Sequence, residues 1–189
     1  MVIRDARADD AAAMLDIYRP FVTDTAVSFE LEPPTIDQFA ERVAKAQSEW
    51  AWLVADADGA IAGYAYAGAF RTRAAYRWTA ETSAYVGATH RGRGVGASLY
   101  HALLRALTDR GFCNAYAGIA LPNEASIALH RSVGFQPVGV FERAGWKFNR
   151  WHDVSWWQLR LADAPGAGAD RTAAALAANG RTDRRSDGG

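Results

Sequence analysis

The chain is poor in groups that could crosslink it. Its 189 residues include a single cysteine, Cys113, which excludes a disulfide within the chain and a metal cluster built from cysteines. We expect no metal site, since His90, His101 and His152 show no metal-ligand spacing. No apolar run is long enough to span a membrane, and the first residues lack the apolar core of a signal peptide. We therefore expect a cytoplasmic protein.

Net charge is also missing. The 21 basic residues balance 21 acidic ones, so the chain lacks the overall basic field of a general nucleic-acid binder. We expect neither a nucleic acid nor a membrane as partner, although a local basic patch stays open. Half of the residues are apolar and 12% are aromatic, which is enough to bury the core of one domain.

Large apolar side chains disappear near the end of the chain. Residues 162–189 contain no aromatic residue, and Leu176 is their only large aliphatic one. Such a segment cannot bury enough surface to offset its ordering entropy. We predict a folded domain at residues 1–161, followed by a disordered tail with a short helical stretch at residues 172–178.

Strand and helix patterns alternate within the predicted domain. Helical spacing begins at Asp9 (as N-cap), Thr35, Gly94 and Asn123, with stops at Gly111 and Gly134 for the last two helices. Strand patterns occupy residues 2–5, 50–55, 61–70, 78–86, 115–120, 135–143 and 151–161, with a hairpin turn at Asp58-Gly59. The resulting order, β-α-α-β-β-β-α-β-α-β-β, predicts an α+β fold with one mixed sheet and helices on both faces, and disfavours a Rossmann sheet.

A glycine-rich turn, Arg91-Gly92-Arg93-Gly94-Val95-Gly96, joins a predicted strand to a predicted helix. Free N–H groups at a helix start carry partial positive charge, and glycines let a ligand approach them, so this turn suits a pyrophosphate. The dinucleotide fingerprint does not fit, because the third glycine comes one residue early and Ala97 stands in its place. The P-loop pattern is absent. A tight connection with two solvated arginines remains the alternative.

Arg91, Gly94 and Gly96 fit the pattern [RQ]-x-x-G-x-[GA], which resembles the acetyl-CoA signature of the GNAT superfamily of N-acetyltransferases. A helix opened by Asn123 and running to Gly134-Phe135 resembles its second signature. Further segments, at residues 27–30, 76–86, 121–123, 145–147 and 151–154, resemble the phosphinothricin and methionine sulfoximine N-acetyltransferases. The resemblance covers residues 2–161.

The resemblance implies a mostly antiparallel sheet, acetyl-CoA as cosubstrate and a homodimer. We expect the aromatic run at residues 146–157 to lie in the core or in the dimer interface. Backbone groups of Ala84, Tyr85 and Val86 would bind the pantetheine and polarise the acetyl carbonyl. The pyrophosphate would lie on the turn, and Asn123, also a good N-cap, would contact the cofactor. The implied cofactor-binding residues are Ala84, Tyr85, Val86, Arg91, Gly92, Arg93, Gly94, Val95, Gly96, Ala97, Asn123 and Ser126.

Two residues are candidates for the proton chemistry. Glu81 lies in an apolar-leaning strand, where an unpartnered carboxylate is costly, and the resemblance makes it the general base. A carboxylate on a strand edge is the alternative. His130 follows Asn123 by two helical turns and could protonate the leaving thiolate, help to deprotonate the amine, or pack in the core through hydrogen bonds.

For the acceptor we predict Phe29, Arg71, Arg73 and Tyr76, since arginine binds carboxylates and aromatic side chains shape pockets. The alternative for each arginine is a solvated loop. The sequence thus predicts an N-acetyltransferase that moves an acetyl group to the primary amine of a small amino acid or analogue by direct attack. Acetylation of a protein N-terminus or a polyamine, or a non-catalytic acetyl-CoA-binding module, remain as alternatives.

Overall fold

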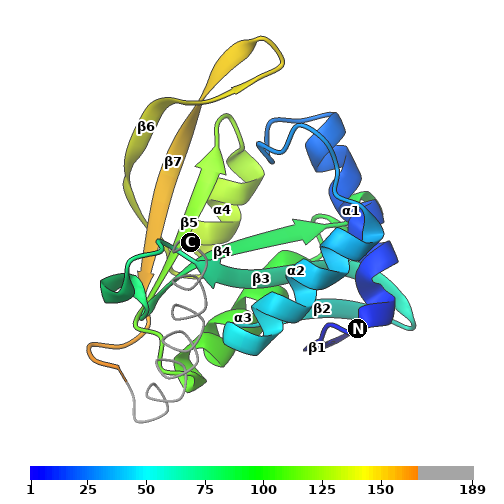
Figure 1. Cartoon of the computed structure of the whole chain (residues 1–189), viewed down its shortest axis with the longest axis horizontal. Coiled ribbons are helices and arrows are strands. Elements are labelled where there is room, and N and C mark those ends of the chain that lie inside the picture. Colours follow the sequence, from blue (N-terminus) through cyan, green and yellow to red (C-terminus); the bar gives the residue numbers. More distant parts are fainter. Residues whose placement is uncertain (166–189) are drawn as a thin grey trace, which may run out of the picture.

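A computed structural model describes residues 1–165 and confirms the predicted order of elements (Figure 1). The helices are α1 (Ala11–Thr23), α2 (Ile36–Glu49), α3 (Val95–Asp109) and α4 (Glu124–Ser132). The strands are β1 (Val2–Asp5), β2 (Trp52–Ala57), β3 (Ala60–Ala69), β4 (Thr79–Val86), β5 (Asn114–Ala120), β6 (Gln136–Lys147) and β7 (Arg150–Arg160). The tail predicted at residues 162–189, with its helical stretch, lies outside the described residues from residue 166 onward. Among the described helices, none is long and apolar enough to cross a membrane.

All seven strands form one sheet in the order β1-β2-β3-β4-β5-β7-β6. Only β4 and β5 pair in parallel, and every other pair is antiparallel, so the sheet is mixed and mostly antiparallel as predicted. Because strand side chains alternate, Tyr64 and Tyr85 pack with α1 and α2 on one face. On the other face Ala65 and Ala80 pack against α3. A third apolar cluster joins α3 and α4 to β5 and β7.

The sheet opens between β4 and β5. The two strands share three register pairs, Thr79↔Asn114, Ala80↔Ala115 and Glu81↔Tyr116. Beyond them β4 stays paired with β3 up to Val86, and β5 stays paired with β7 up to Ala120, so each strand follows a different neighbour. Figure 1 shows the two strands diverging. At the vertex the Thr82 hydroxyl donates to the Tyr116 carbonyl at 3.1 Å.

Local sequence signals explain most of the element ends. The Thr35 hydroxyl accepts from the Gln38 N–H and the Gln38 side chain accepts from the Thr35 N–H, which is a capping box at the start of α2. Asp58 and Gly59 both have positive φ, as a two-residue hairpin turn between β2 and β3 requires. Gly111 and Gly134 have positive φ just after α3 and α4.

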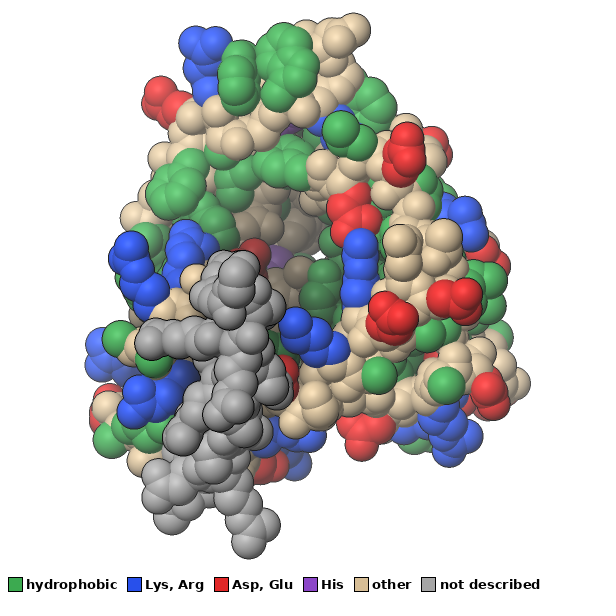
Figure 2. All heavy atoms as spheres, in the orientation of Figure 1, with side chains coloured by type: hydrophobic (Ala, Val, Ile, Leu, Met, Phe, Trp, Pro, Cys, Tyr) green, Lys and Arg blue, Asp and Glu red, His purple; other side chains and the backbone are tan. Residues whose placement is uncertain are grey.

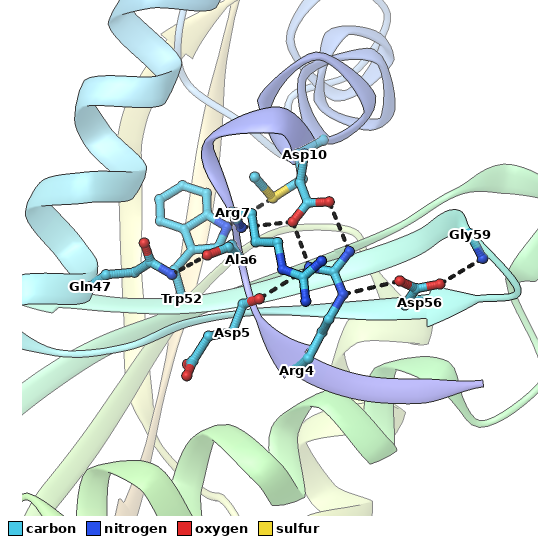
Figure 3. Close-up of polar contacts among 10 residues, drawn as sticks. Arg4, Asp5, Ala6, Arg7, Asp10, Gln47, Trp52, Asp56 and Gly59 are labelled. Carbon is cyan, nitrogen blue, oxygen red and sulfur yellow. Dashed lines mark hydrogen bonds and ion pairs between the residues drawn. The ribbon is translucent and has the colours of Figure 1, made fainter.

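The predicted N-cap of the first helix was wrong. A short 3-10 turn at Ala8–Asp10 precedes α1, and it is Asp10, not Asp9, that accepts from a backbone N–H, that of Arg7, at 2.7 Å. Arg4 also holds this carboxylate through two hydrogen bonds of 2.7 and 2.9 Å. Arg4 reaches Asp56 with its Nε at 3.0 Å, and Asp56 in turn accepts from the Gly59 N–H (Figure 3). One guanidinium therefore ties β1, the start of α1 and the β2–β3 turn together.

Two strands differ in extent from the sequence prediction. Trp50 closes α2, with its N–H donating to the Ala46 carbonyl, so β2 begins at Trp52 rather than Trp50. β6 runs on to Lys147 rather than ending at Arg143, because Arg143 takes a positive φ inside a break in register and pairing with β7 resumes at Gly145. The longer β6–β7 hairpin extends beyond the sheet toward the α1–α2 connection (Figure 1).

We predict that Asp10→Asn lowers the free energy of unfolding by about 1–3 kcal/mol at pH 7, because Arg4 then keeps a buried hydrogen-bond partner that carries no charge. Arg4 lowers the pKa of Asp10 from its ordinary value of 3.8, so this stabilisation is fully present above pH 3.8. It is lost as pH falls through the lowered pKa. Denaturant unfolding at pH 7 and at acidic pH measures both the loss of unfolding free energy and its pH dependence. Asp9→Asn, at an exposed neighbour, is the control, and equal losses in the two variants would contradict the account.

Candidate active site

The glycine-rich turn has the geometry of an anion site. Gly92 and Gly94 take φ of +71° and +78°, a region in which other residues are strained. Gly94 is the N-cap of α3 and offers no side chain, so no cap bond covers the first N–H groups of this helix. Gly96 lies against α4, where an added Cβ would approach Leu129 to 3.0 Å. The turn from Arg91 to Gly94 is exposed and thus accessible to a ligand.

The predicted arginines of the turn behave differently. Arg91 folds back on the end of β4, where its Nε donates to the Val86 carbonyl at 3.2 Å and its guanidinium lies 5.0 Å from the Phe21 ring. Arg93 is exposed. Val86, Tyr85 and Ala84 lie on the edge of β4 that faces the gap, and within the part of the chain that the structure describes this edge has no paired strand there. Unpaired backbone groups of this kind accept an extended ligand as a strand edge does.

Glu81 and Phe29 line one cavity of about 270 Å³. The cavity lies on the α1–α2 face of the sheet, between β4, β5 and the β6–β7 hairpin, and the surface is hollowed between the hairpin and α1 (Figure 2). Apart from Glu81 its walls are apolar or glycine: Val27, Phe29, Gly118, Ala120, Phe141, Ala144, Val154 and Trp156. A single carboxylate in such a cavity is the arrangement expected of a general base.

The apolar surroundings act directly on Glu81. Burial raises the pKa of this carboxyl above its ordinary value of 4.5, and the positive charge of Arg71 partly opposes the shift. A raised pKa makes the carboxylate a stronger base for an ammonium proton. Glu81 forms neither an ion pair nor a side-chain hydrogen bond within residues 1–165, so its oxygens remain available to a ligand.

The predicted acceptor residues divide into two groups. Arg71 lies beside the cavity, with its guanidinium 4.2 Å from the Phe70 ring and 5.7 Å from the ring of Trp156, which is a wall residue. Tyr76 does not line the cavity but packs against Phe70, at a centroid distance of 5.8 Å. Arg73 is exposed ahead of the 3-10 turn Ala74–Tyr76 and does not line the cavity. The structure therefore brings together Phe29, Glu81 and Arg71.

His130 lies on the opposite face of the sheet from Glu81 and is 5% exposed. Its Nδ1 is 2.7 Å from the Ser126 carbonyl, which can only accept, so Nδ1 carries the proton. Nε2 must then accept from the Tyr100 hydroxyl, also at 2.7 Å. Burial lowers the pKa of His130, which disfavours a second proton. A buried, neutral and hydrogen-bonded ring favours a packing role for His130 over protonation of the thiolate or deprotonation of the amine.

Asn123 performs its predicted capping role. Its side-chain oxygen accepts from the Ser126 N–H at 3.1 Å at the start of α4. The Ser126 hydroxyl in turn lies 3.3 Å from His130 Nδ1. Contacts of either residue with the cofactor remain a prediction.

Sequence reasoning missed most of the cavity wall. The aromatic run at residues 146–157 is assigned to core or interface, but strand alternation sends Trp157 into the core and Trp156 with Val154 to the cavity. That alternation was the available signal. Phe70 was also missed, although it stacks on Tyr116 at 4.5 Å and contacts Trp156.

We predict that His130 is neutral at pH 7 and titrates below its ordinary pKa of 6.5. Tyr100→Phe removes the hydroxyl that donates to Nε2, which stabilises the neutral ring, so the pKa of His130 should rise in this variant. Imidazole NMR signals followed against pH, in the unmodified chain and in Tyr100→Phe, measure both. A His130 signal that titrates at or above 6.5 in the unmodified chain contradicts the arrangement.

Comparison with known proteins identifies relatives over most of the chain. The family model described as an acetyltransferase (GNAT) domain matches residues 3–156. The chain is 40% identical to the phosphinothricin N-acetyltransferase of Streptomyces viridochromogenes, over 82% of this chain and 85% of that protein. It is 37% identical to the L-methionine sulfoximine/L-methionine sulfone acetyltransferase of Pseudomonas paraeruginosa, over 84% of this chain and 94% of that protein.

Solved structures agree with these relatives. The fold is similar to that of a GNAT superfamily phosphinothricin acetyltransferase from Sinorhizobium meliloti in complex with acetyl-CoA, with a TM-score of 0.84 and 36% identity. The match covers 88% of this chain and 94% of that one. Together with the family model, these similarities show that the chain belongs to the GNAT acetyltransferases.

Proposed function

We propose that the chain is an acetyl-CoA-dependent N-acetyltransferase whose acceptor is a small amino acid or a close analogue. The observation that carries this proposal is the placement of Glu81, a partly buried carboxylate with a raised pKa, in an apolar cavity at the point where β4 leaves β5. Family membership supports the acetyl transfer. The cavity supports the class of acceptor.

The cofactor would supply an acetyl thioester. In the proposed reaction Glu81 takes the proton of the acceptor ammonium, directly or through a water, so that the amine nitrogen can form a bond to the acetyl carbon. The carbon–sulfur bond breaks, the thiolate leaves, and the second proton that the nitrogen loses passes to the thiolate, directly or through a water. Backbone groups of Ala84, Tyr85 and Val86 would hold the pantetheine and polarise the carbonyl, and the N–H groups at the start of α3 would hold the pyrophosphate.

His130 would position groups rather than move a proton. Its ring joins α4, through the Ser126 carbonyl, to α3, through the Tyr100 hydroxyl. This junction lies on the α3–α4 face, while Glu81 lies on the α1–α2 face, so the two candidates meet only across the gap between β4 and β5.

Size and charge support an amino-acid acceptor. A cavity of about 270 Å³ suits a small molecule, and its apolar wall suits a short side chain. Arg71 beside the wall could bind a carboxylate. The relatives are named for phosphinothricin and methionine sulfoximine, which are acceptors of this class. Arg73 and Tyr76 would contribute only if their segment moves toward the cavity.

Assembly and location complete the proposal. Large apolar side chains are exposed along the β6–β7 hairpin, at Val138, Val140, Phe141, Trp146, Phe148 and Trp151. Hydrophobic side chains are prominent on this hairpin in Figure 2. Such a surface supports a homodimer. We also propose that the enzyme acts in the cytoplasm.

We predict that Glu81→Gln lowers kcat/KM for methionine sulfoximine by about a hundredfold to ten-thousandfold, the usual contribution of a general base, while acetyl-CoA still binds. Thiol release measured against methionine sulfoximine, phosphinothricin, methionine sulfone, aminoacyl peptides and a polyamine tests the acceptor class. Full activity in Glu81→Gln would contradict the proposed role of Glu81 as the general base. Turnover of peptides or polyamines alone would overturn the amino-acid proposal.

The pH dependence of kcat/KM follows from the same carboxylate. Glu81 must be ionised to accept a proton, so kcat/KM should fall as pH drops through a pKa above 4.5. Since the charge of Arg71 lowers this pKa, Arg71→Gln should move the acidic limb to higher pH. Arg73→Gln is the matched control and should leave the limb in place. An unmoved limb in Arg71→Gln would contradict the assignment.

A further inference from the structure

Lys147 is a buried cation whose ammonium, within the described residues, donates to backbone carbonyls and forms no ion pair; burial lowers its pKa, and the charge of Glu30 partly opposes that shift. Lys147 lies at the end of β6 and is 4% exposed. Its Nζ donates to two backbone carbonyls, those of Val22 at 2.6 Å and of Ser28 at 2.7 Å. Both acceptors lie more than a hundred residues away in sequence, one in the last turn of α1 and the other in the α1–α2 connection.

The Lys147 ammonium binds two carbonyls in different surroundings, one at a helix end and one in a loop. Val22 is in the last turn of α1, where carbonyls lack helical partners and the helix dipole is negative, so a cation there is stabilising. Ser28 is fixed from the other side, since its hydroxyl lies 2.7 Å from the Tyr18 hydroxyl of α1 and accepts from the Glu30 N–H. Lys147 thus links the end of α1 to Ser28 and holds both ends of the segment at residues 23–28.

The segment held in this way, residues 23–28, leads directly into the cavity wall. Val27 and Phe29, on either side of Ser28, both line the cavity that contains Glu81. Phe29 packs against Gly145, where an added Cβ would overlap its ring, and Ala144 next to that glycine is another wall residue. His152, 3% exposed, holds the same hairpin end, with its Nε2 3.0 Å from the Lys147 carbonyl. The hairpin tip and the loop therefore form one side of the cavity together.

We propose that Lys147 is a positioning residue for the acceptor, which it serves by holding Val27 and Phe29 against the β6–β7 hairpin as the outer wall of the Glu81 cavity. This inference rests on the proposed function, because it takes that cavity to be the acceptor site. Lys147 does not line the cavity and stays outside the chemistry. Its two bonds fix where the wall stands, and the contact of Phe29 with Gly145 fixes how much room the acceptor has.

The sequence offers an internal control, because Lys147 and Lys45 are its only lysines. Lys45 is exposed on α2 and donates to none of the described side chains or carbonyls in the hydrogen-bond pattern. Lys147→Met keeps the length of the side chain and removes the ammonium, and Lys45→Met does the same at the control site. Both variants are measured in the full chain with methionine sulfoximine and acetyl-CoA, alongside Glu81→Gln.

Lys147→Met should raise KM for the acceptor about tenfold to a hundredfold, the range set by losing hydrogen bonds from a charged donor. KM for acetyl-CoA should be unchanged, and Lys45→Met should match the unmodified chain. Hydrogen exchange of the backbone amides of residues 23–30 should quicken in Lys147→Met alone. Exchange that quickens with no change in acceptor KM overturns the positioning role, and so does an equal loss in both KM values.

A second variant covers the case in which Lys147→Met does not fold. Gly145→Ala keeps the Lys147 side chain and puts a methyl group where the Phe29 ring lies, so the ring must shift and KM should rise for the acceptor and not for acetyl-CoA. An unchanged acceptor KM in this variant overturns the inference. Failure of the proposed function gives a different result: no acceptor turns over in the unmodified chain, or Glu81→Gln stays active. Hydrogen exchange then still decides whether Lys147 holds the loop.

Discussion

The divergence of β4 from β5 is the constraint on which the site depends. Within residues 1–165, a parallel pair that stops after Glu81↔Tyr116 leaves strand edges without a paired strand on both sides of a gap in the middle of the sheet. The strands cannot close this gap, because β3 holds β4 and β7 holds β5 along their lengths. An extended ligand with amide groups could complete the hydrogen bonding there. The pantetheine of acetyl-CoA has that chemistry.

The gap also arranges the elements around it. The chain leaves the end of β4 through the glycine-rich turn into α3, and leaves the end of β5 into α4 through Asn123. Both helix starts therefore lie near the open end of the gap. Glu81 faces one side of the sheet and His130 the other, so the group proposed to take the amine proton is separated from the Tyr100–His130 pair by the sheet itself.

The sequence predicted what local chemistry determines. Element order follows from periodicity and from glycines with positive φ at Gly59, Gly111 and Gly134. Strand alternation is equally local, and it puts Glu81 on the same face of β4 as Tyr85. Asp10 was missed as the carboxylate at the start of α1 because Arg4, a residue of another element, selects it over Asp9. A local pattern cannot show that selection.

Contacts between distant segments were the main omission from the site. Lys147 meets Val22 and Ser28 only after the whole domain has folded, and no spacing in the sequence marks that meeting. Arg71 and Arg73 look alike in sequence, yet only Arg71 lies over Phe70 and near Trp156. The family resemblance suggested Glu81 as the base and residue type suggested Phe29 for the pocket, whereas the rest of the cavity wall required the structure.

The most direct test of the central claim is a crystal structure of the chain bound to a bisubstrate ligand, in which coenzyme A is joined through an acetyl linker to the amine of methionine sulfoximine. The account predicts the pantetheine between β4 and β5 beyond Glu81, the pyrophosphate at the start of α3, and the former amine nitrogen within one water of the Glu81 carboxylate. The amino-acid part should lie between Phe29 and Trp156. A ligand that leaves the gap empty, or that places its amine nitrogen away from Glu81, would contradict the account.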